Sequence, residues 1–238
     1  MFYFDPLYFL FIAPAFLLAL YAQFRVKSAF SRYSRVGTMS GITGAAAARR
    51  ILDSNGLHDV AIEAARGWLS DHYDPRSRVL RLSPEVYATP SVAAAGIAAH
   101  EAGHALQHAA GYAPLKIRNA IVPTASIGSW LAFPMILIGA LMSAKGLALG
   151  GDLALAGFLL FSAFVVFQLF TLPVELDASR RAKKVIADLG IIRTQEEAAG
   201  VSTVLNAAAL TYVAATLSAL AQLLYFALRL GLIGGRRS

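Results

Sequence analysis

The chain has 238 residues, of which 57% are hydrophobic and only 15% are charged, and its mean hydropathy of +0.58 is too high for an ordinary soluble domain. The net charge of +7 comes from basic residues beside apolar segments, without the alternation of aromatic and basic residues found in single-strand binders. We therefore expect a lipid bilayer as partner, and no nucleic acid. The absence of cysteine excludes disulfides and thiolate metal ligands, so a bound metal must use histidine and carboxylate.

Four long apolar segments carry few or no charges, and each approaches the ~20 residues that cross a bilayer as a helix. They are residues 7–24, 121–144, 153–174 and 207–228. The first has neither a basic region before it nor a small-residue cleavage site, so it is expected to stay in the mature protein as an anchor. The sequence thus predicts a mainly α-helical integral membrane protein with three to four transmembrane helices.

Charges beside the apolar segments predict the orientation in the membrane. Four basic residues follow the first segment directly, whereas the residues before it include no lysine or arginine. The four are Arg25, Lys27, Arg32 and Arg35. By the positive-inside rule, the N-terminus lies outside and residues 25–118 face the cytoplasm. Four crossings would also place the C-terminus outside, although Arg229, Arg236 and Arg237 favour the cytoplasm. Whether the last helix crosses or lies against the protein stays open.

A small α+β region is predicted after the first apolar segment. Residues 38–54 are rich in alanine and should form a short helix that ends at Asn55-Gly56. Three short, partly alternating stretches follow, at residues 58–63, 67–73 and 77–83. The sequence Asp74-Pro75-Arg76-Ser77 favours a turn that joins the last two into a hairpin, so we expect a short antiparallel sheet. Its clearest strand, residues 79–83, either binds substrate backbone by strand addition or is an ordinary interior strand.

Three further helices are indicated by local signals. Ser91 can cap a run of helix-forming residues at 92–110. After the third apolar segment, Pro173 suits the first turn of a new helix. Thr194 and Glu197 form a capping-box pattern that opens the last helix.

The helix at 92–110 contains an H-E-x-x-H run. Positions i and i+4 of a helix lie on the same face, so His100 and His104 can both direct an imidazole nitrogen at one tetrahedral Zn²⁺. Glu101 is then placed to act as a base on a metal-bound water. The alternative is a pair of partly buried histidines without a metal, which the intervening glutamate disfavours.

Two histidines leave a zinc site without its third protein ligand. The candidates elsewhere in the chain are His108, Glu175, Asp177, His58 and His72. Glu175 is best placed, because two membrane crossings separate it from His104 and return it to the same side of the bilayer. The alternative for Glu175 and Asp177 is a carboxylate that complements the dipole of a helix's first turn. His108 lies one turn beyond His104, and we interpret it as a residue that supports a ligand without touching the metal, or as a surface residue.

The run H-E-A-G-H-A-L-Q-H follows a D-H-Y-D-P hairpin and an L-R-L-S strand, and a hydrophobic hairpin separates it from L-P-V-E-L-D-A-S. Across nearly the whole chain this pattern resembles the bacterial YugP-type membrane zinc metallopeptidases. That family is similar in layout to the Ste24 and HtpX membrane proteases, where a glutamate after a membrane hairpin completes the zinc site. The resemblance implies a zincin-like subdomain, one Zn²⁺ held by His100, His104 and Glu175, Glu101 as catalytic base, and a bacterial inner-membrane location.

The pattern departs from the HtpX-like one near the third ligand. Ser179 stands four residues after Glu175, where an aspartate is expected, and Asp177 stands two after it. Which acid orients a ligand histidine is therefore open. An oxyanion donor is also needed; Tyr212, Tyr112 and His108 are candidates, although interfacial tyrosines are the simpler interpretation of the first two.

The sequence predicts a zinc-dependent membrane endopeptidase that hydrolyses peptide bonds at the cytoplasmic membrane surface, with proteins or peptides, membrane proteins among them, as substrates. One alternative is an intramembrane, site-2-like protease whose zinc helix is itself a span. Another is a catalytically inactive membrane scaffold in which zinc only joins the soluble subdomain to the membrane hairpin. Spans without charged residues argue against a transporter.

The predicted segments are a first transmembrane helix (1–24), a cytoplasmic subdomain (25–118), a transmembrane hairpin (119–174), a cytoplasmic helix with the third ligand (175–205) and a C-terminal transmembrane or membrane-associated helix (206–238).

Overall fold

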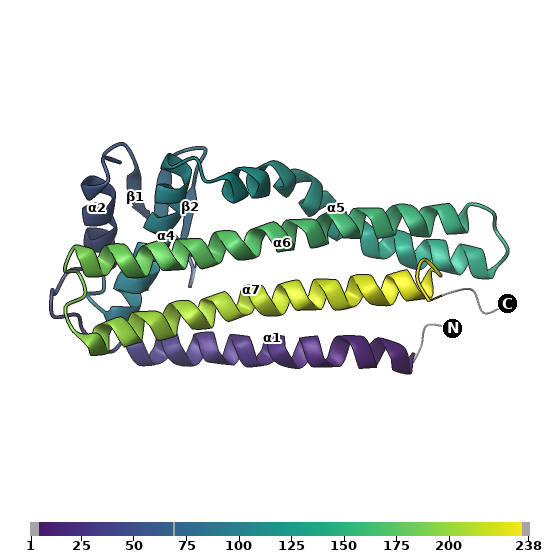
Figure 1. Ribbon diagram of the computed structural model, residues 1–238, viewed down its shortest axis with the longest axis horizontal. Helices are drawn as coiled ribbons and strands as arrows, with labels where there is room; N and C mark the ends of the chain where they lie inside the picture. The colour runs from purple at the N-terminus through teal and green to yellow at the C-terminus, as the bar shows by residue number, and fades with distance from the viewer. Residues whose placement is uncertain (1–4, 69, 235–238) are drawn as a thin grey trace. The chain divides into compact units, whose positions relative to one another are not determined.

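The computed structural model describes residues 5–68 and 70–234. Within them the helices are α1 (Pro6–Tyr33), α2 (Gly44–Ser54), α3 (Pro84–Tyr87), α4 (Val92–Ala109), α5 (Ala113–Ala144), α6 (Gly150–Asp188) and α7 (Gln195–Arg229), and the strands are β1 (Ala61–Ala64), β2 (His72–Asp74) and β3 (Val79–Leu82) (Figure 1). The prediction of a mainly helical protein with a small sheet is confirmed. The predicted topology signals at Arg236 and Arg237 lie outside the described residues.

Four of the described helices, α1, α5, α6 and α7, are long and apolar enough to cross a membrane. Each contains one of the four predicted apolar segments and extends beyond it, so the prediction of four helices of membrane-spanning length is confirmed. The zinc-motif helix α4 is not among the helices with this length and hydropathy in the described part of the chain.

Pro173 does not begin a new helix, so that prediction was wrong. Helix α6 continues through it from Gly150 to Asp188. A proline inside a helix removes one backbone hydrogen bond, which membrane-type helices tolerate, and the residues after Pro173 are mostly good helix formers. The apolar segment and the carboxylates that follow it therefore belong to one continuous helix.

The chain forms two compact units. Unit 1 comprises Met1–Tyr21, Ile117–Leu172 and Tyr212–Ser238, and unit 2 comprises Ala22–Lys116 and Pro173–Thr211. In unit 1, α5 and α6 form an antiparallel hairpin that depends on close backbone contact. A Cβ atom on Gly128 would lie 2.7 Å from the carbonyl oxygen of Leu160, and one on Gly157 would lie 2.8 Å from that of Ala132. Small residues at such contacts are typical of packed membrane helices.

A polar cluster joins the start of α1 to the end of α7 within unit 1. One carboxylate oxygen of Asp5, Oδ2, accepts a hydrogen bond from the Tyr225 hydroxyl at 3.1 Å and lies 3.3 Å from Nε of Arg229. The ring of Tyr8 packs edge-on against Tyr225. Both ends of the described chain therefore lie at the same end of unit 1. Asp5 also compensates the charge of Arg229, which weakens Arg229 as a signal for the cytoplasm.

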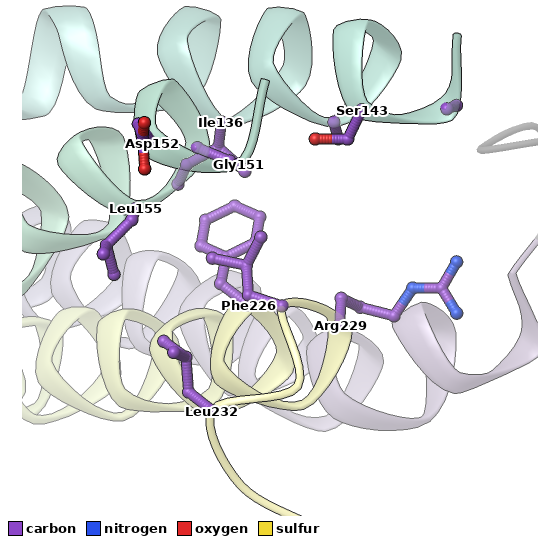
Figure 2. Close-up of a pocket in the computed structure, with 12 residues that line it drawn as sticks. Ile136, Ser143, Gly151, Asp152, Leu155, Phe226, Arg229 and Leu232 are labelled. Atoms are coloured by element: carbon purple, nitrogen blue, oxygen red, sulfur yellow. The ribbon is translucent and has the colours of Figure 1, made fainter. Parts of the chain in front are cut away.

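Unit 1 also contains a cavity of about 560 Å³ lined by α5, α6 and the end of α7 (Figure 2). Its lining is largely apolar and includes Ile136, Leu155 and Phe226, with Asp152 and Arg229 as its charged residues. No histidine lines this cavity, so it is not the predicted metal site.

The sheet of unit 2 has the strand order β1-β3-β2. The predicted hairpin is confirmed, because β2 pairs antiparallel with β3 and Asp74 accepts hydrogen bonds from Arg76 and Ser77 in the turn. The prediction of a purely antiparallel sheet was wrong, since β1 pairs parallel with β3. The most buried strand, β3, takes the central position between two more exposed strands. Both of its edges are occupied, so residues 79–83 cannot accept a substrate strand, and the open edges belong to β1 and β2.

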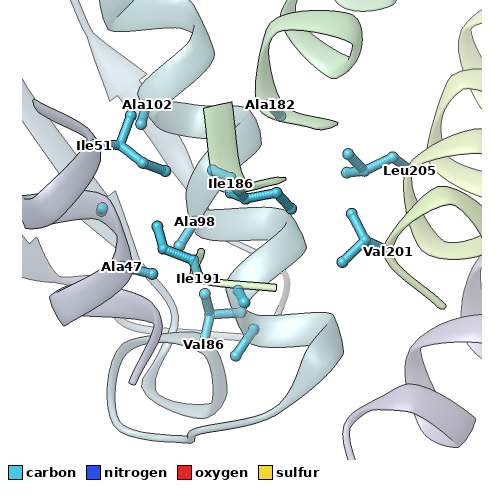
Figure 3. Close-up of a cluster of buried hydrophobic side chains, with 14 of the residues drawn as sticks. Ala47, Ile51, Val86, Ala98, Ala102, Ala182, Ile186, Ile191, Val201 and Leu205 are labelled. Carbon is cyan, nitrogen blue, oxygen red and sulfur yellow. The ribbon is translucent and has the colours of Figure 1, made fainter. Parts of the chain in front are cut away.

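The core of unit 2 surrounds α4 with apolar side chains from α2, α6 and α7 (Figure 3). Ile51, Ile186 and Leu205 are almost completely buried against the alanines of α4, among them Ala98 and Ala102. Alanine has a high helix propensity and a small side chain, so α4 can be both stable and closely surrounded. The zinc-motif helix is thus the central helix of a protein core.

Local capping signals fix where the helices of unit 2 begin. Ser91 accepts a hydrogen bond from the amide of Ala94 at the start of α4, as predicted. The predicted capping box is confirmed at α7, where Thr194 and Glu197 each accept from the other's backbone amide. Glu197 also accepts from the amide of Met39, which holds the segment before α2. Helix α2 starts at Gly44 rather than at residue 38, because Thr43 provides the cap.

Candidate metal centre

Helix α4 presents the histidines of the H-E-x-x-H run on one face, as the spacing predicts. The imidazole rings of His100 and His104 lie 4.8 Å apart between centroids and nearly perpendicular to each other. Their side chains are only 13% and 10% exposed, so each retains limited access to solvent. The two rings can therefore direct nitrogens at a common point.

Glu175 of α6 reaches the same point from the other side. Its Oε2 atom lies 3.1 Å from Nε2 of His100 and 3.5 Å from Nε2 of His104. The potential ligand atoms of these three residues all lie within 4.8 Å of one another. Of the five candidates for a third ligand, the structure brings Glu175 to the histidine pair.

The remaining histidine candidates are engaged elsewhere. His58, which follows α2, hydrogen-bonds to Asp53 in the last turn of that helix. His72 hydrogen-bonds to the carbonyl of Ser70. His108 hydrogen-bonds through Nδ1 to the hydroxyl of Tyr73 on β2 at 2.9 Å. None of the three belongs to the cluster around Glu175.

The three clustered residues fit a zinc ion. Two imidazole nitrogens and one carboxylate oxygen are ligands that Zn²⁺ commonly takes, and three protein ligands leave one position of a tetrahedron open, as in catalytic sites. Both Nε2 atoms face the carboxylate, while the Nδ1 atoms point away toward other groups of the protein. This is the arrangement expected when Nε2 coordinates and Nδ1 is held by an outer contact.

Those outer contacts are neutral side chains. The Ser179 hydroxyl lies 3.1 Å from Nδ1 of His100, and Oε1 of Gln107 lies 3.0 Å from Nδ1 of His104. Gln107 is not among the site residues expected from the sequence. Its signal is the i+3 spacing from His104, which places both side chains on one face of α4.

Asp177, the other acid after the predicted ligand, contacts Gln107 rather than a histidine. Its Oδ2 atom accepts a hydrogen bond from Nε2 of Gln107 at 2.9 Å and another from Nε of Arg181 at 2.6 Å. The Arg181 guanidinium lies over the ring of Tyr112, which engages that oxyanion candidate. The other tyrosine candidate, Tyr212, belongs to unit 1 and stays a prediction.

Glu101 lies beside the histidines in a nearly dry position, with 8% of its surface exposed. Burial raises the pKa of the Glu101 carboxyl; the histidine charges oppose the rise, and the charges of Glu175 and Asp71 add to it. A base is most effective when its pKa lies close to the working pH, so this displacement of the pKa suits proton transfer.

Helix α6 approaches α4 so closely that only glycine fits at the fourth position of the motif. A Cβ atom on Gly103 would lie 2.7 Å from the carbonyl oxygen of Ala178, three residues after Glu175. Alanine is intrinsically better in a helix than glycine by about 1 kcal/mol, so any harm from Gly103→Ala must come from this contact.

We expect Gly103→Ala to displace α6, to lower the thermal stability and to weaken zinc binding by at least about tenfold, as loss of outer contacts does. Metal content would measure the zinc binding, and thermal unfolding would measure the stability, each in detergent. Gly151→Ala is the matched control, because a Cβ there meets nothing within 4 Å. Wild-type zinc content in Gly103→Ala would contradict the proposed helix contact.

Comparison with known proteins agrees with the metal-binding cluster found in the structure. Residues 8–231 match the family described as "Putative neutral zinc metallopeptidase". The chain belongs to this family. A relative from Bacillus subtilis (strain 168), "Putative membrane protease YugP", is 51% identical over 220 residues, which cover 92% of this chain and 94% of the relative. No solved structure matches the chain.

The comparison confirms the resemblance found in the sequence. Membership in the zinc metallopeptidase family implies zinc, and the cluster of His100, His104 and Glu175 provides a set of ligands for it. The name of the relative and the four apolar helices agree with a membrane protein.

Proposed function

We propose that the protein is a zinc-dependent membrane endopeptidase in which His100, His104 and Glu175 hold one zinc ion. The observation that carries this proposal is the convergence of these three residues beside a buried glutamate. Three protein ligands would leave one position of a tetrahedral zinc ion open. When bound there, zinc supplies Lewis acidity that polarises the scissile carbonyl and lowers the pKa of water to about 7.

Glu101 provides the proton transfers. As a carboxylate it accepts a proton from the attacking water, and as a carboxylic acid it returns that proton to the nitrogen of the departing amine. Because Glu101 is buried and its pKa is raised, both protonation states are accessible more easily than for a solvated glutamate. Glu175 is held away from this task by its contacts with both histidines.

The substrate is proposed to bind in extended form along β2. This strand lies at an edge of the described sheet and packs against α4, which carries the motif. Backbone amide and carbonyl groups at an open strand edge can pair with a peptide of any sequence. A peptide bound there would lie beside the helix with Glu101.

The two rival functions are less well supported. An intramembrane protease would need α4 as a span, but the apolar residues of α4 are covered by the core of unit 2. A zinc-stapled scaffold would need a fourth protein ligand. The nearest candidates are engaged, since His108 bonds to Tyr73 and Asp177 bonds to Gln107 and Arg181.

The function is tested by removing the metal. Detergent-solubilised protein should contain one zinc per chain and should cleave casein or an unfolded membrane protein. A chelator should lower the rate by at least about 100-fold, as expected when the Lewis acid is removed, and one equivalent of zinc should restore it. Magnesium, which prefers oxygen ligands, serves as the control ion. Undiminished cleavage by the zinc-free protein would contradict the proposal.

We further propose that the site faces the cytoplasm, because basic residues such as Arg25, Lys27 and Arg32 follow the first apolar segment. Reporters fused to the N-terminus and to the C-terminus should then both report a location outside the cytoplasm. The contact of Asp5 with Arg229 brings the start of α1 and the end of α7 together, so both ends are expected on the same side. A reporter inserted after Gly56, in the exposed turn beyond α2, should report the cytoplasm. Opposite locations for the two terminal reporters would show that the helices cross an odd number of times.

A further inference from the structure

Gln107 is completely buried, and both polar atoms of its side-chain amide have partners. One of these atoms lies 2.8 Å from the carbonyl oxygen of Val174 and 2.9 Å from Oδ2 of Asp177. A backbone carbonyl and an ionised carboxylate can only accept hydrogen bonds. The amide atom that faces them must therefore be the NH₂ group, and the atom that faces His104 must be the oxygen.

This orientation determines which nitrogen of His104 carries hydrogen. The Gln107 oxygen lies 3.0 Å from Nδ1 of His104, and an amide oxygen can only accept. His104 must donate through Nδ1, and a neutral imidazole has a single N–H. The lone pair is consequently left on Nε2, the nitrogen that faces Glu175 at 3.5 Å.

Asp177 makes the reverse orientation of the amide unfavourable. It is kept as a charged acceptor by Arg181, whose Nε donates at 2.6 Å, and its side chain is only 14% exposed. If the Gln107 amide were reversed, its oxygen would face both this carboxylate and the Val174 carbonyl. The NH₂ group would then donate to Nδ1 of His104 and force the hydrogen onto Nε2, where it would block coordination.

The partner of the other histidine does not make this selection. Ser179 lies 3.1 Å from Nδ1 of His100, but a hydroxyl can donate or accept, so it permits either form of the ring. The two histidines are therefore held by different means.

We propose that Gln107 and Asp177 are positioning residues which fix the hydrogen of His104 on Nδ1 and keep Nε2 ready to bind the metal. The acid two residues after Glu175 thus acts on a histidine through a buried amide, without touching the ring. This inference rests on the proposed zinc site, and it extends it by assigning a role to two residues outside the ligand set.

The test is the zinc dissociation constant of the full-length protein in detergent, measured by competition with a chromophoric chelator. Gln107→Met keeps the side-chain volume but removes the acceptor, and it should raise the constant by about 10- to 100-fold. Asp177→Leu should raise it by about tenfold, whereas Asp177→Asn, which retains an oxygen for Gln107, should stay close to wild type. The absorption spectrum of bound Co²⁺ should shift in the first two variants and not in the third.

A double variant separates positioning from general damage to the fold. If Asp177 acts through Gln107, the double Gln107→Met, Asp177→Leu protein should bind zinc no more weakly than Gln107→Met alone. Arg180→Gln is the control, because Arg180 contacts the same carboxylate at 3.9 Å from a 79% exposed position. Thermal unfolding of the zinc-free variants should show that each one folds.

Zinc affinity within about twofold of wild type in Gln107→Met, or additive effects in the double variant, would overturn the inference. The readout is metal binding, so its failure is distinguishable from that of the proposed function. A wild type that binds zinc tightly but cleaves nothing would overturn the endopeptidase alone, and a wild type that binds no zinc would overturn both.

Discussion

Replacing Glu101 by glutamine is expected to lower kcat for peptide cleavage by about 10²- to 10⁴-fold, the usual contribution of a positioned general base. Glutamine has the same shape but cannot take a proton from water. Zinc should remain bound, because Glu101 is not one of the three clustered residues. Rates on casein and metal content, both in detergent, measure the two quantities. Unchanged cleavage by a folded, zinc-loaded variant would contradict the role of Glu101 as base.

The same substitution has a second signature in the zinc-free protein. Burial raises the pKa of Glu101 above its unfolded value, so ionisation of the carboxyl begins to oppose folding as the pH rises past the unfolded pKa, and this opposition is complete above the folded pKa. Glutamine removes that opposition. Glu101→Gln should therefore unfold at a higher temperature than wild type above this pKa, and the difference should shrink as the pH falls and Glu101 becomes protonated. A stability gain that persists at low pH would point to a different cause.

Replacing Glu175 by glutamine is expected to abolish tight zinc binding and, with it, activity. The change leaves two histidines as ligands, so the loss of affinity should exceed the roughly 10- to 100-fold that loss of an outer contact causes. Equilibrium dialysis against zinc would measure it. Asp188→Asn is the matched control, because it neutralises an exposed carboxylate at the end of the same helix. Glu101→Gln and Glu175→Gln should thus lose activity for different reasons, the first with zinc and the second without.

A wild-type zinc affinity in Glu175→Gln would show that another residue completes the site. In that case His108 would be the next candidate, and its hydrogen bond to Tyr73 would have to break. The result would also remove the main support for a site assembled between α4 and α6.

Local signals explain what the sequence could predict. Helix α4 is indicated by its cap at Ser91, its uninterrupted helix formers and the spacing of His100 and His104. Each of these signals can be read within a few neighbouring residues. The turn at Asp74 and the capping box at Thr194 are local in the same way. Each of these was placed correctly.

Non-local contacts explain what it could not. The contact between His100 and Glu175 joins residues 75 positions apart, and only membrane topology and the family resemblance pointed to it. The parallel pairing of β1 with β3 depends on where the intervening chain travels, which no local pattern records. Pro173 suits the first turn of a helix in a soluble protein, but here a long apolar helix continues through it. Gln107 was missed because an amide becomes informative only when both of its partners are known.

The absence of a side chain at Gly103 has a consequence for how such proteins can be recognised. A bare H-E-x-x-H pattern specifies two ligands and a base but says nothing of the third ligand. In this chain the carbonyl of Ala178 occupies the space that any side chain at the fourth position would need. Chains that deliver their third ligand on a helix this close should carry glycine there, so H-E-x-G-H is the more selective pattern to search for.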